Sequence, residues 1–501
     1  MSLGSIRYLA NLSLLIAAVP ALLASPVINE LMFHAPGNPA EDTREEWIEL
    51  YNTSKTSINV SGWRFTKGID FTTPEGTQLP ANGFLIVAAD TATFRTAHPD
   101  INPDVIGNWI GRLSNDSETI TLTNADGNPV DQLDYATQGD WGLRTQSAPE
   151  KEITGWIWEN KADGDGHSLE KRQPLVRLSS GMAWALSTEA GGTPGATNST
   201  FTENLAPVIQ DVAHEPIIPR SSDTITITAQ VTDDADPSTV VSLFYRIDGD
   251  QPWQQQAMHD NNSIHDTIIG PFTSKVIIEY YVEAQDAEEQ KHFWPRPSKK
   301  SGVWPNVFDA EAFEQFNNAL VQVDDAYHLN SWEPGSPPRY RIIMTAEQRD
   351  LLKKAQDLSS RSVHINVAFH ATFVSEDGTG VKARHNAAVR DRGFSSRSGP
   401  PVNYHVAFPS GDRWNECKSI QLNSRFPFSH ALGAAMFQLA GLSTTEAVPV
   451  EVFVNGVITA DTAAVGYAAM SELNLSTETG RSGSFQMTQM AISTVSMTMP
   501  L

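Results

Sequence analysis

The chain has 501 residues and a formal net charge of −24, which comes from 59 acidic and 35 basic residues. This length predicts several domains, and 40% hydrophobic with 19% charged residues is typical of folded globular protein rather than of a disordered chain. The negative charge argues against binding to nucleic acid or to an anionic membrane surface. The single cysteine, Cys417, excludes an intrachain disulfide bond.

Residues 1–25 have the order of features that secretory signals share. Arg7 supplies a positive charge, the apolar run Leu9–Leu23 follows, and the small residues Ala24 and Ser25 come next. We therefore expect residues 1–25 to be a signal peptide that is removed on export, and the protein to be secreted or held in the cell envelope. The alternative is a membrane anchor, but the run is short for a span, and we expect no permanent membrane span.

Residues 26–200 predict an all-β sandwich that folds on its own, because short alternating stretches follow one another without a strong helical period. The expected strands are VINELMF, EEWIELYN, GFLIVAA, ETITLTN and PVDQLDY. Asn82-Gly83 and Asp126-Gly127 indicate turns, and Gly191–Gly195 closes the segment as a linker.

Residues 205–297 predict a second, smaller sandwich of the Ig or fibronectin kind, since TITITAQV, VVSLFYRID and KVIIEYYVEAQD alternate cleanly. The alternate apolar residues are expected in its core: Ile225, Ile227, Phe244 and Ile277. His214 and Asp233-Asp234 are expected in loops. Residues 298–338 are expected to form a linker with one short helix, Ala310–Leu320.

Residues 339–480 predict an incomplete α+β domain, because helical and strand patterns mix there. TAEQRDLLKKAQ predicts a helix with Thr345 as its N-cap, and SHALGAAMFQLAGL predicts a helix that Gly441 ends. Strands are expected at Val363–Phe373 and Ala387–Gly393, and VEVFVNG predicts a strand that runs into a tight Asn455-Gly456 turn.

Residues 481–501 differ from the rest of the chain: they have no charge after Arg481 and contain four methionines. Because methionine has a single codon, the pairs Met487-Thr488 and Met490-Ala491 encode aspartate and glycine one nucleotide upstream. Our hypothesis is a frameshift near position 480, so that the third domain stops early. The alternative is a disordered tail.

The first domain resembles a bacterial lamin-tail domain, an Ig-like sandwich. The blocks that carry the resemblance are INELMFHAPG, EEWIELYN, VSGWRF, LPANGFLIVAAD, DGHSLEKR and GGTPGATN. We expect Trp47, Trp63 and Phe84 to be buried in the sandwich, with Glu46 and Glu49 on its polar face.

Residues 339–480 resemble the start of the spore-coat CotH-type kinase family, atypical secreted kinases that phosphorylate serine with ATP and a divalent metal. The blocks are AVRDRGFSSR, NYHVAFP, KSIQLNS, the helix 429–442, VPVEVFVNG and YAAMSELN. The resemblance implies ATP with Mg or Mn as cofactors and a protein substrate. The family's catalytic aspartates lie beyond the matching blocks, and Asn403 replaces a common lysine, so we expect no catalysis from this chain.

A basic set in this region is the candidate for ATP phosphate contacts: Arg390, Arg392, Arg397 and Lys418. The alternative is ordinary ion pairing with neighbouring acids. Glu472 is the candidate catalytic residue, as a glutamate that places a lysine or a metal. The alternative function is a non-catalytic extracellular binding or adhesion protein with a cell-surface partner.

Three further features bear on metal binding or thiol chemistry. Asp163–Gly166 has two aspartates suited to calcium but lacks the other loop ligands, so a turn is expected. His364, His370 and His385 are too scattered along the chain to predict a zinc site. Cys417 is expected to be a structural thiol.

Overall fold

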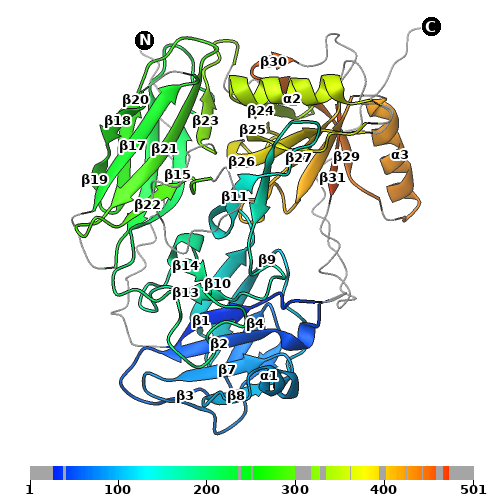
Figure 1. The fold of residues 1–501 in the computed structure, drawn as a ribbon. Coiled ribbons are helices and arrows are strands. Elements are labelled where there is room, and N and C mark those ends of the chain that lie inside the picture. Colours follow the sequence, from blue (N-terminus) through cyan, green and yellow to red (C-terminus); the bar gives the residue numbers. More distant parts are fainter. Residues whose placement is uncertain are drawn as a thin grey trace, which may run out of the picture.

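The computed structural model describes residues 26–37, 41–234, 239–249, 252–298, 317–327, 335–360, 363–393, 402–424, 426–442, 444–458 and 467–472. They form a mostly β protein of three domains that pack against one another (Figure 1). The first domain lies at the bottom of the view, the second at the upper left and the third at the upper right. The expected signal peptide and tail lie outside the described residues.

The first domain is built on two antiparallel sheets with one parallel edge. The larger sheet has the order β14 (Trp184–Leu186), β13 (Leu169–Lys171), β1 (Pro26–Met32), β2 (Trp47–Asn52), β7 (Phe84–Ala88) and β8 (Asp104–Gly107). The smaller has the order β10 (Pro129–Ala136), β9 (Ser117–Thr123), β4 (Arg64–Lys67) and β5 (Phe71–Thr72). Short pairs are β3 (Ile58–Asn59) with β6 (Gln78–Leu79) and β11 (Leu143–Gln146) with β12 (Trp156–Glu159). All five expected strands are confirmed.

Short helices complete this domain, and the alternation pattern did not predict them. They are η1 (Thr43–Glu45), α1 (Thr91–Ala97), η2 (Gly139–Trp141) and η3 (Gly181–Ala183). Asp90 caps α1 by accepting a hydrogen bond from the Thr93 backbone N–H at 2.8 Å. Trp47 is buried, as expected, whereas Trp63 and Phe84 are only half-buried.

Two glutamates that we expected on a polar face are buried instead. Glu46 accepts a hydrogen bond from the Leu113 N–H at 2.8 Å, and Glu49 accepts from Gly195 N–H and from the Asn29 amide. The prediction was wrong because α1 and the chain after β14 cover the second face of the sheet, so alternation along β2 does not alternate burial.

The segment Gly191–Gly195, which we expected to be a linker, is held to the sheet by hydrogen bonds to buried carboxylates. Glu30 accepts hydrogen bonds from the Thr193 N–H at 2.7 Å and from the Ser168 hydroxyl at 2.6 Å. Burial raises the pKa of Glu30 to about 8, and hydrogen bonds from Ser168 and Thr193 oppose the rise. Burial likewise raises the pKa of Glu49, and the Glu30 charge adds to the rise.

We expect Glu30 to make the folded chain less stable as the pH rises. A carboxyl with a higher pKa when folded holds its proton more tightly in the folded state, so its contribution is complete below pH 4.5 and is lost towards pH 8. Glu30→Gln should therefore be more stable than the parent at pH 8, by about 1–3 kcal/mol, with a smaller difference at pH 5. Urea unfolding at both pH values measures this, with the exposed Glu75→Gln as control; equal pH dependence in parent and Glu30→Gln contradicts it.

The second domain is a two-sheet sandwich. One sheet has the order β15 (Val208–Glu215), β16 (Ile225–Thr232), β20 (Ile264–Ile269) and β19 (His259–Asn261). The other has β18 (Gln254–Ala257), β17 (Val240–Ile247), β21 (Ile277–Gln285) and β22 (Lys291–Trp294), and β23 (Ala319–Gln322) also pairs with β21. The last two residues of the expected helix 310–320 thus begin a strand, and residues 310–316 lie outside the described part. Ile225, Ile227 and Ile277 are in the core, as predicted, whereas Phe244 is only half-buried.

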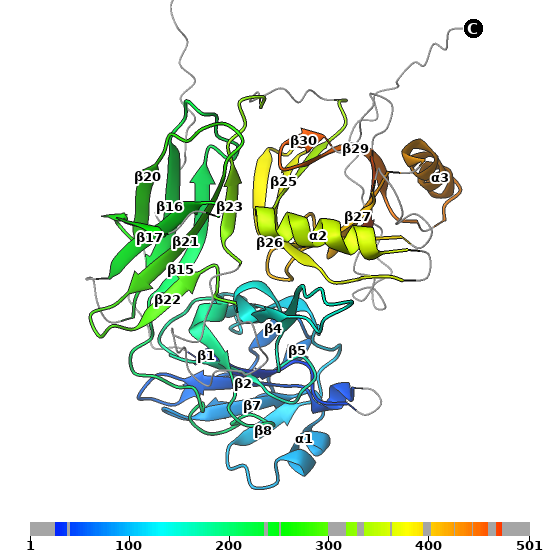
Figure 2. The same cartoon turned by 45° about the horizontal axis from the view of Figure 1, so that its top comes forward.

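The third domain is one mixed sheet with two helices. Its order is β24 (Arg339–Ile343), β25 (Phe369–Glu376), β26 (Val381–Asp391), β27 (Tyr404–Ala407), β28 (Ser419–Asn423), β31 (Tyr467–Glu472), β29 (Ala447–Val454) and β30 (Val457–Ile458). β29 also pairs in parallel with β24, so the pairings close a ring that leaves out only β30. Helix α2 (Ala346–Leu358) packs on β25 and β26, and α3 (Pro427–Leu439) packs on β29 and β31 (Figure 2).

Local signals in this domain are confirmed where they were strongest. The Thr345 hydroxyl accepts from the Gln348 N–H at 3.3 Å and caps α2. Asn455 and Gly456 have φ values of 48° and 75°, and they join β29 to β30 in a tight hairpin. The strand expected at 363–373 begins only at Phe369.

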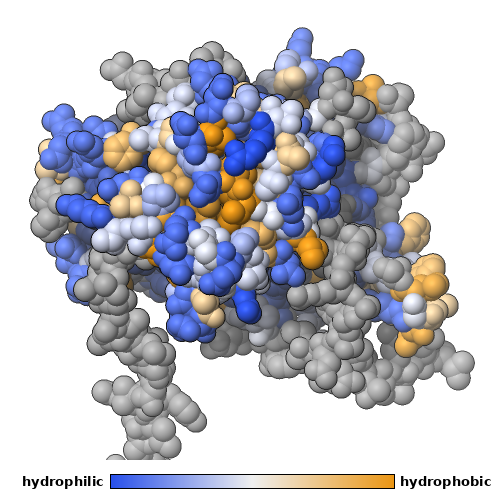
Figure 3. Space-filling model, turned by 90° about the horizontal axis from the view of Figure 1, so that it is seen from below, coloured by the Kyte–Doolittle hydropathy of each residue, from blue (hydrophilic) through white to orange (hydrophobic). Residues whose placement is uncertain are grey.

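Helix α3 presents its large apolar side chains to solvent. The small residue Ala434 is buried against the sheet, whereas Leu432 is 63% and Leu439 is 89% exposed. The apolar cluster at the right edge of Figure 3 lies where Figure 1 places α3. Val450 and Val452 of β29 are buried, whereas Val457 of β30 is exposed.

Candidate functional site

The first domain extends an arm, residues 143–159, into the third domain. The arm contains β11 and β12, and it rises between the two domains in Figure 1. The Trp156 N–H donates to the Ala368 carbonyl at 2.8 Å, and Ile153 belongs to the core of the third domain. A β-carbon on Gly155 would lie 2.3 Å from the Ala368 carbonyl oxygen, so this close approach requires glycine.

Arg144 is the buried polar anchor of the arm. Its guanidinium donates to the Asn386 carbonyl and to Nδ1 of His370, both at 3.1 Å, and lies 5.2 Å from the Trp158 ring. Burial, and secondly the Arg144 charge, lowers the pKa of His370 to about 3. The neutral ring therefore accepts at Nδ1 and donates from Nε2 to the Asn318 carbonyl at 2.8 Å. One histidine thereby connects all three domains.

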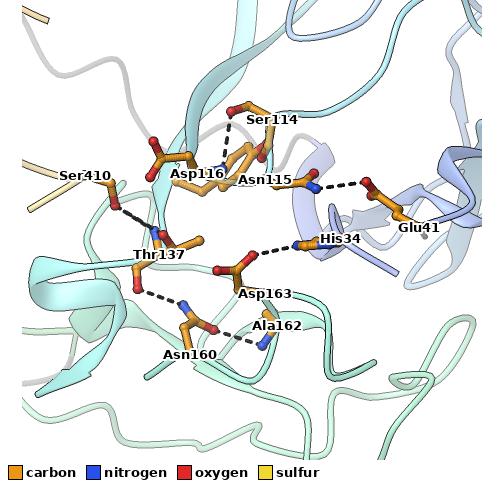
Figure 4. A network of polar contacts seen from close by, with 11 residues as sticks. His34, Glu41, Ser114, Asn115, Asp116, Thr137, Asn160, Ala162, Asp163 and Ser410 are labelled. Atoms are coloured by element: carbon orange, nitrogen blue, oxygen red, sulfur yellow. Dashed lines mark hydrogen bonds and ion pairs between the residues drawn. The ribbon is translucent and has the colours of Figure 1, made fainter. Parts of the chain in front are cut away.

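A second junction involves Lys418 of the expected phosphate-binding set. Its ammonium lies 2.7 Å from Asp116 of the first domain, and Arg413 pairs with the same carboxylate. Beside it the Ser410 hydroxyl accepts from the backbone N–H groups of Thr137 and Gln138 at 3.1 and 3.0 Å (Figure 4). Lys418 thus serves a contact between domains in this structure.

The remaining members of that set lie elsewhere. The register places Ser419 level with Ala388 across β27, so Lys418 and Arg392 are roughly 16 Å apart along the strands. Arg390 donates to the Asp391 carbonyl at 3.3 Å, and Arg392 donates to Asn423. Arg397 lies outside the described residues. The sheet does not bring Lys418 and the two arginines together.

Glu472, the candidate catalytic residue, lies at the end of β31. Its Cα is the register partner of Ser419, so its backbone is adjacent to that of Lys418. The strand order thus brings the backbones of Glu472 and Lys418 together.

A cavity of about 380 Å³ lies where the three domains meet. It is lined by η2 and η3 of the first domain, by β15 of the second, and by β26 and the loop 409–412 of the third. Its chemically distinctive lining residues are Asp140, Trp141, Asp211, His214, Trp294, His385 and Asp412. Cavities at domain boundaries are frequent ligand sites.

Two histidines line this cavity, and both are neutral. Burial lowers the pKa of His214 to about 4 and that of His385 well below its ordinary value. Their rings lie 5.6 Å apart. His214 hydrogen-bonds to the Tyr280 hydroxyl and the Ile217 carbonyl, each at 3.2 Å. Our assignment of His214 to a loop was wrong, because β15 extends to Glu215 and carries it into the interior.

The acidic residues of the cavity come from different domains. Burial raises the pKa of Asp140 to about 6; Arg296 opposes the rise and Asp412 adds to it. Arg296 donates to the Asp140 backbone carbonyl at 3.1 Å. The Asp412 side chain is 57% exposed and lies 4.0 Å from Arg384. The sequence does not indicate that Asp140, Asp211 and Asp412 line one cavity, because these residues are more than 70 positions apart in the chain.

The candidate calcium turn, the candidate metal ligands and Cys417 can also be compared with the structure. Asp163 lies 2.6 Å from Nδ1 of His34 at a turn (Figure 4). In the described part of the chain no group of three or more metal-binding side chains is arranged around a common point. Cys417 is buried, and its thiol donates to the Asn415 carbonyl at 3.4 Å.

Comparisons with known proteins identify one part of the chain. A search of curated proteins finds no match. No helix among the described residues has the length and apolar character needed to cross a membrane. Residues 23–137 match the Lamin Tail Domain family. The match ends just before η2, whereas β13 and β14 extend the same sheet beyond it. This multidomain β-rich chain therefore contains a lamin tail domain at residues 23–137.

Proposed function

We propose that this chain is an extracytoplasmic binding protein. In this proposal a lamin tail domain and an Ig-like sandwich pack against a CotH kinase-like domain that does not transfer phosphate. Support for export comes from the order of charge, apolar run and small residues in 1–25. Support for a kinase-like third domain comes from blocks such as AVRDRGFSSR and KSIQLNS.

The observation that favours a binding function over catalysis is the ion pair between Lys418 and Asp116 of the first domain. Phosphoryl transfer needs cationic groups that converge on the phosphates and acids that hold the metal. Here Lys418 pairs with Asp116 of the first domain, and the strand register separates it from Arg390 and Arg392. The arm of the first domain instead packs into the third domain, and all three domains contribute residues to the lining of one cavity.

We expect the purified 501-residue protein to incorporate no label from radioactive ATP with Mg²⁺ or Mn²⁺, either into itself or into a serine-containing protein substrate. The reason is that the cationic side chains of the expected set that the structure describes do not converge on one point where the developing charge of a phosphoryl group could lie. Lys418→Ala is the control, and both proteins should give the background signal. Incorporation by the parent that Lys418→Ala abolishes would establish the kinase alternative in place of this proposal.

A further inference from the structure

The cavity between the three domains has the lining expected of a site for a positively charged small molecule. Asp140, Asp211 and Asp412 line it, and no lysine or arginine of the described chain does. Trp141 and Trp294 line it as well, and indole faces attract cations. Its volume of about 380 Å³ is in the range of small-molecule sites.

The basic side chains near the cavity offset only part of the negative charge of its carboxylates, so that charge can still attract a cation. Arg296 donates to the Asp140 backbone carbonyl at 3.1 Å, and none of the hydrogen bonds of the described residues involves the Asp140 carboxylate. Arg384 lies 4.0 Å from Asp412, and Arg296 lies near Asp140. These two arginines do not line the cavity, and they offset part of the negative charge of the two carboxylates. His385 is neutral and therefore does not repel a cation.

The packing also fixes the position of the deeper carboxylate. A β-carbon on Gly181 would lie 2.1 Å from the Asp140 backbone oxygen, so η2 and η3 touch at this point. Trp141 follows directly and packs 6.1 Å from the Trp184 ring. A charged group held by such contacts before a ligand arrives loses little freedom on binding.

We propose that this cavity binds a small organic cation, whose ammonium or guanidinium group lies between Asp140 and Asp412 and against the two tryptophan rings. The inference rests on the proposed binding function, which it deepens by naming the ligand class. The cationic group can belong to a free molecule or to a lysine or arginine side chain of a peptide, since the recognising chemistry is the same.

Calorimetry of the full chain at constant ionic strength tests this inference. We expect methylguanidinium and n-butylammonium to bind, and n-butanol and n-butyrate not to bind. Asp140→Asn and Asp412→Asn should each weaken cation binding about tenfold, because each removes one charge partner without changing shape. Asp126→Asn, an exposed change in the turn between β9 and β10, should leave the affinity unchanged.

Absence of cation binding, equal binding of n-butanol, or unchanged affinity in both cavity variants overturns the proposal. Should Asp140→Asn fail to fold, as judged by its melting curve, Asp412→Asn decides the matter, because that side chain is more than half exposed. A glycine-flanked arginine pentapeptide forms the second arm: tighter binding than methylguanidinium identifies a peptide side chain as ligand, and equal or weaker binding identifies a free molecule. The ATP assay is independent, so it can fail while cation binding holds.

Discussion

Trp47→Ala should lower the free energy of unfolding of the full chain by about 3–5 kcal/mol, the range found when a buried aromatic ring is truncated. The Trp47 side chain is 1% exposed on β2. Its ring meets Phe94 of α1 at 5.9 Å and His98 at 6.2 Å, both edge-on. Truncation removes these contacts and leaves a cavity that the sheet and α1 cannot both close.

Urea unfolding of the parent and the variant measures this effect. Trp63→Ala is the control, because Trp63 is half-buried against a different core cluster of the same domain, and its truncation should cost about 1–2 kcal/mol. A loss below 1 kcal/mol for Trp47→Ala, or an equal loss in the two variants, would show that the ring does not anchor the sandwich.

Arg144→Ala should destabilise the junction between the first and third domains by about 2–4 kcal/mol. The change removes the donor from three buried acceptors: the carbonyls of Asn386 and Ala387 and Nδ1 of His370. It also removes a burial cost, since burial lowers the pKa of Arg144 to about 9 and no carboxylate pairs with it in the described structure. The lost hydrogen bonds outweigh that gain because all three acceptors stay buried.

Arg144→Met separates the two contributions, since it keeps the volume of the side chain but not its donors. We expect Arg144→Met to lie between the parent and Arg144→Ala, and both variants to unfold in two steps where the parent unfolds in one. Limited proteolysis within 143–159 should quicken in both. Unchanged stability and a single step in Arg144→Ala would mean that the arm docks without its arginine.

Several expectations from the sequence are matched because short-range chemistry decides them. The alternation in TITITAQV predicted β16, whose buried residues alternate with more exposed ones. KVIIEYYVEAQD predicted β21, although residues on both faces of that strand are buried. Thr345 caps α2, and Asn455-Gly456 makes a hairpin, because these residues satisfy local backbone needs. Four of the six lamin-tail blocks, from INELMFHAPG to LPANGFLIVAAD, lie within the family match at 23–137, whereas DGHSLEKR and GGTPGATN lie beyond it.

By itself, then, the sequence determined the β-rich class, most strands, the helix caps and the lamin tail domain. Only the tertiary structure decided that Glu49 is buried, that Arg144 anchors an arm in another domain, and that Asp140 and Asp412 face one cavity. Periodicity records which face of an element is apolar, but not what covers the other face. These groups are joined by contacts between residues far apart in the chain, and such contacts leave no local pattern.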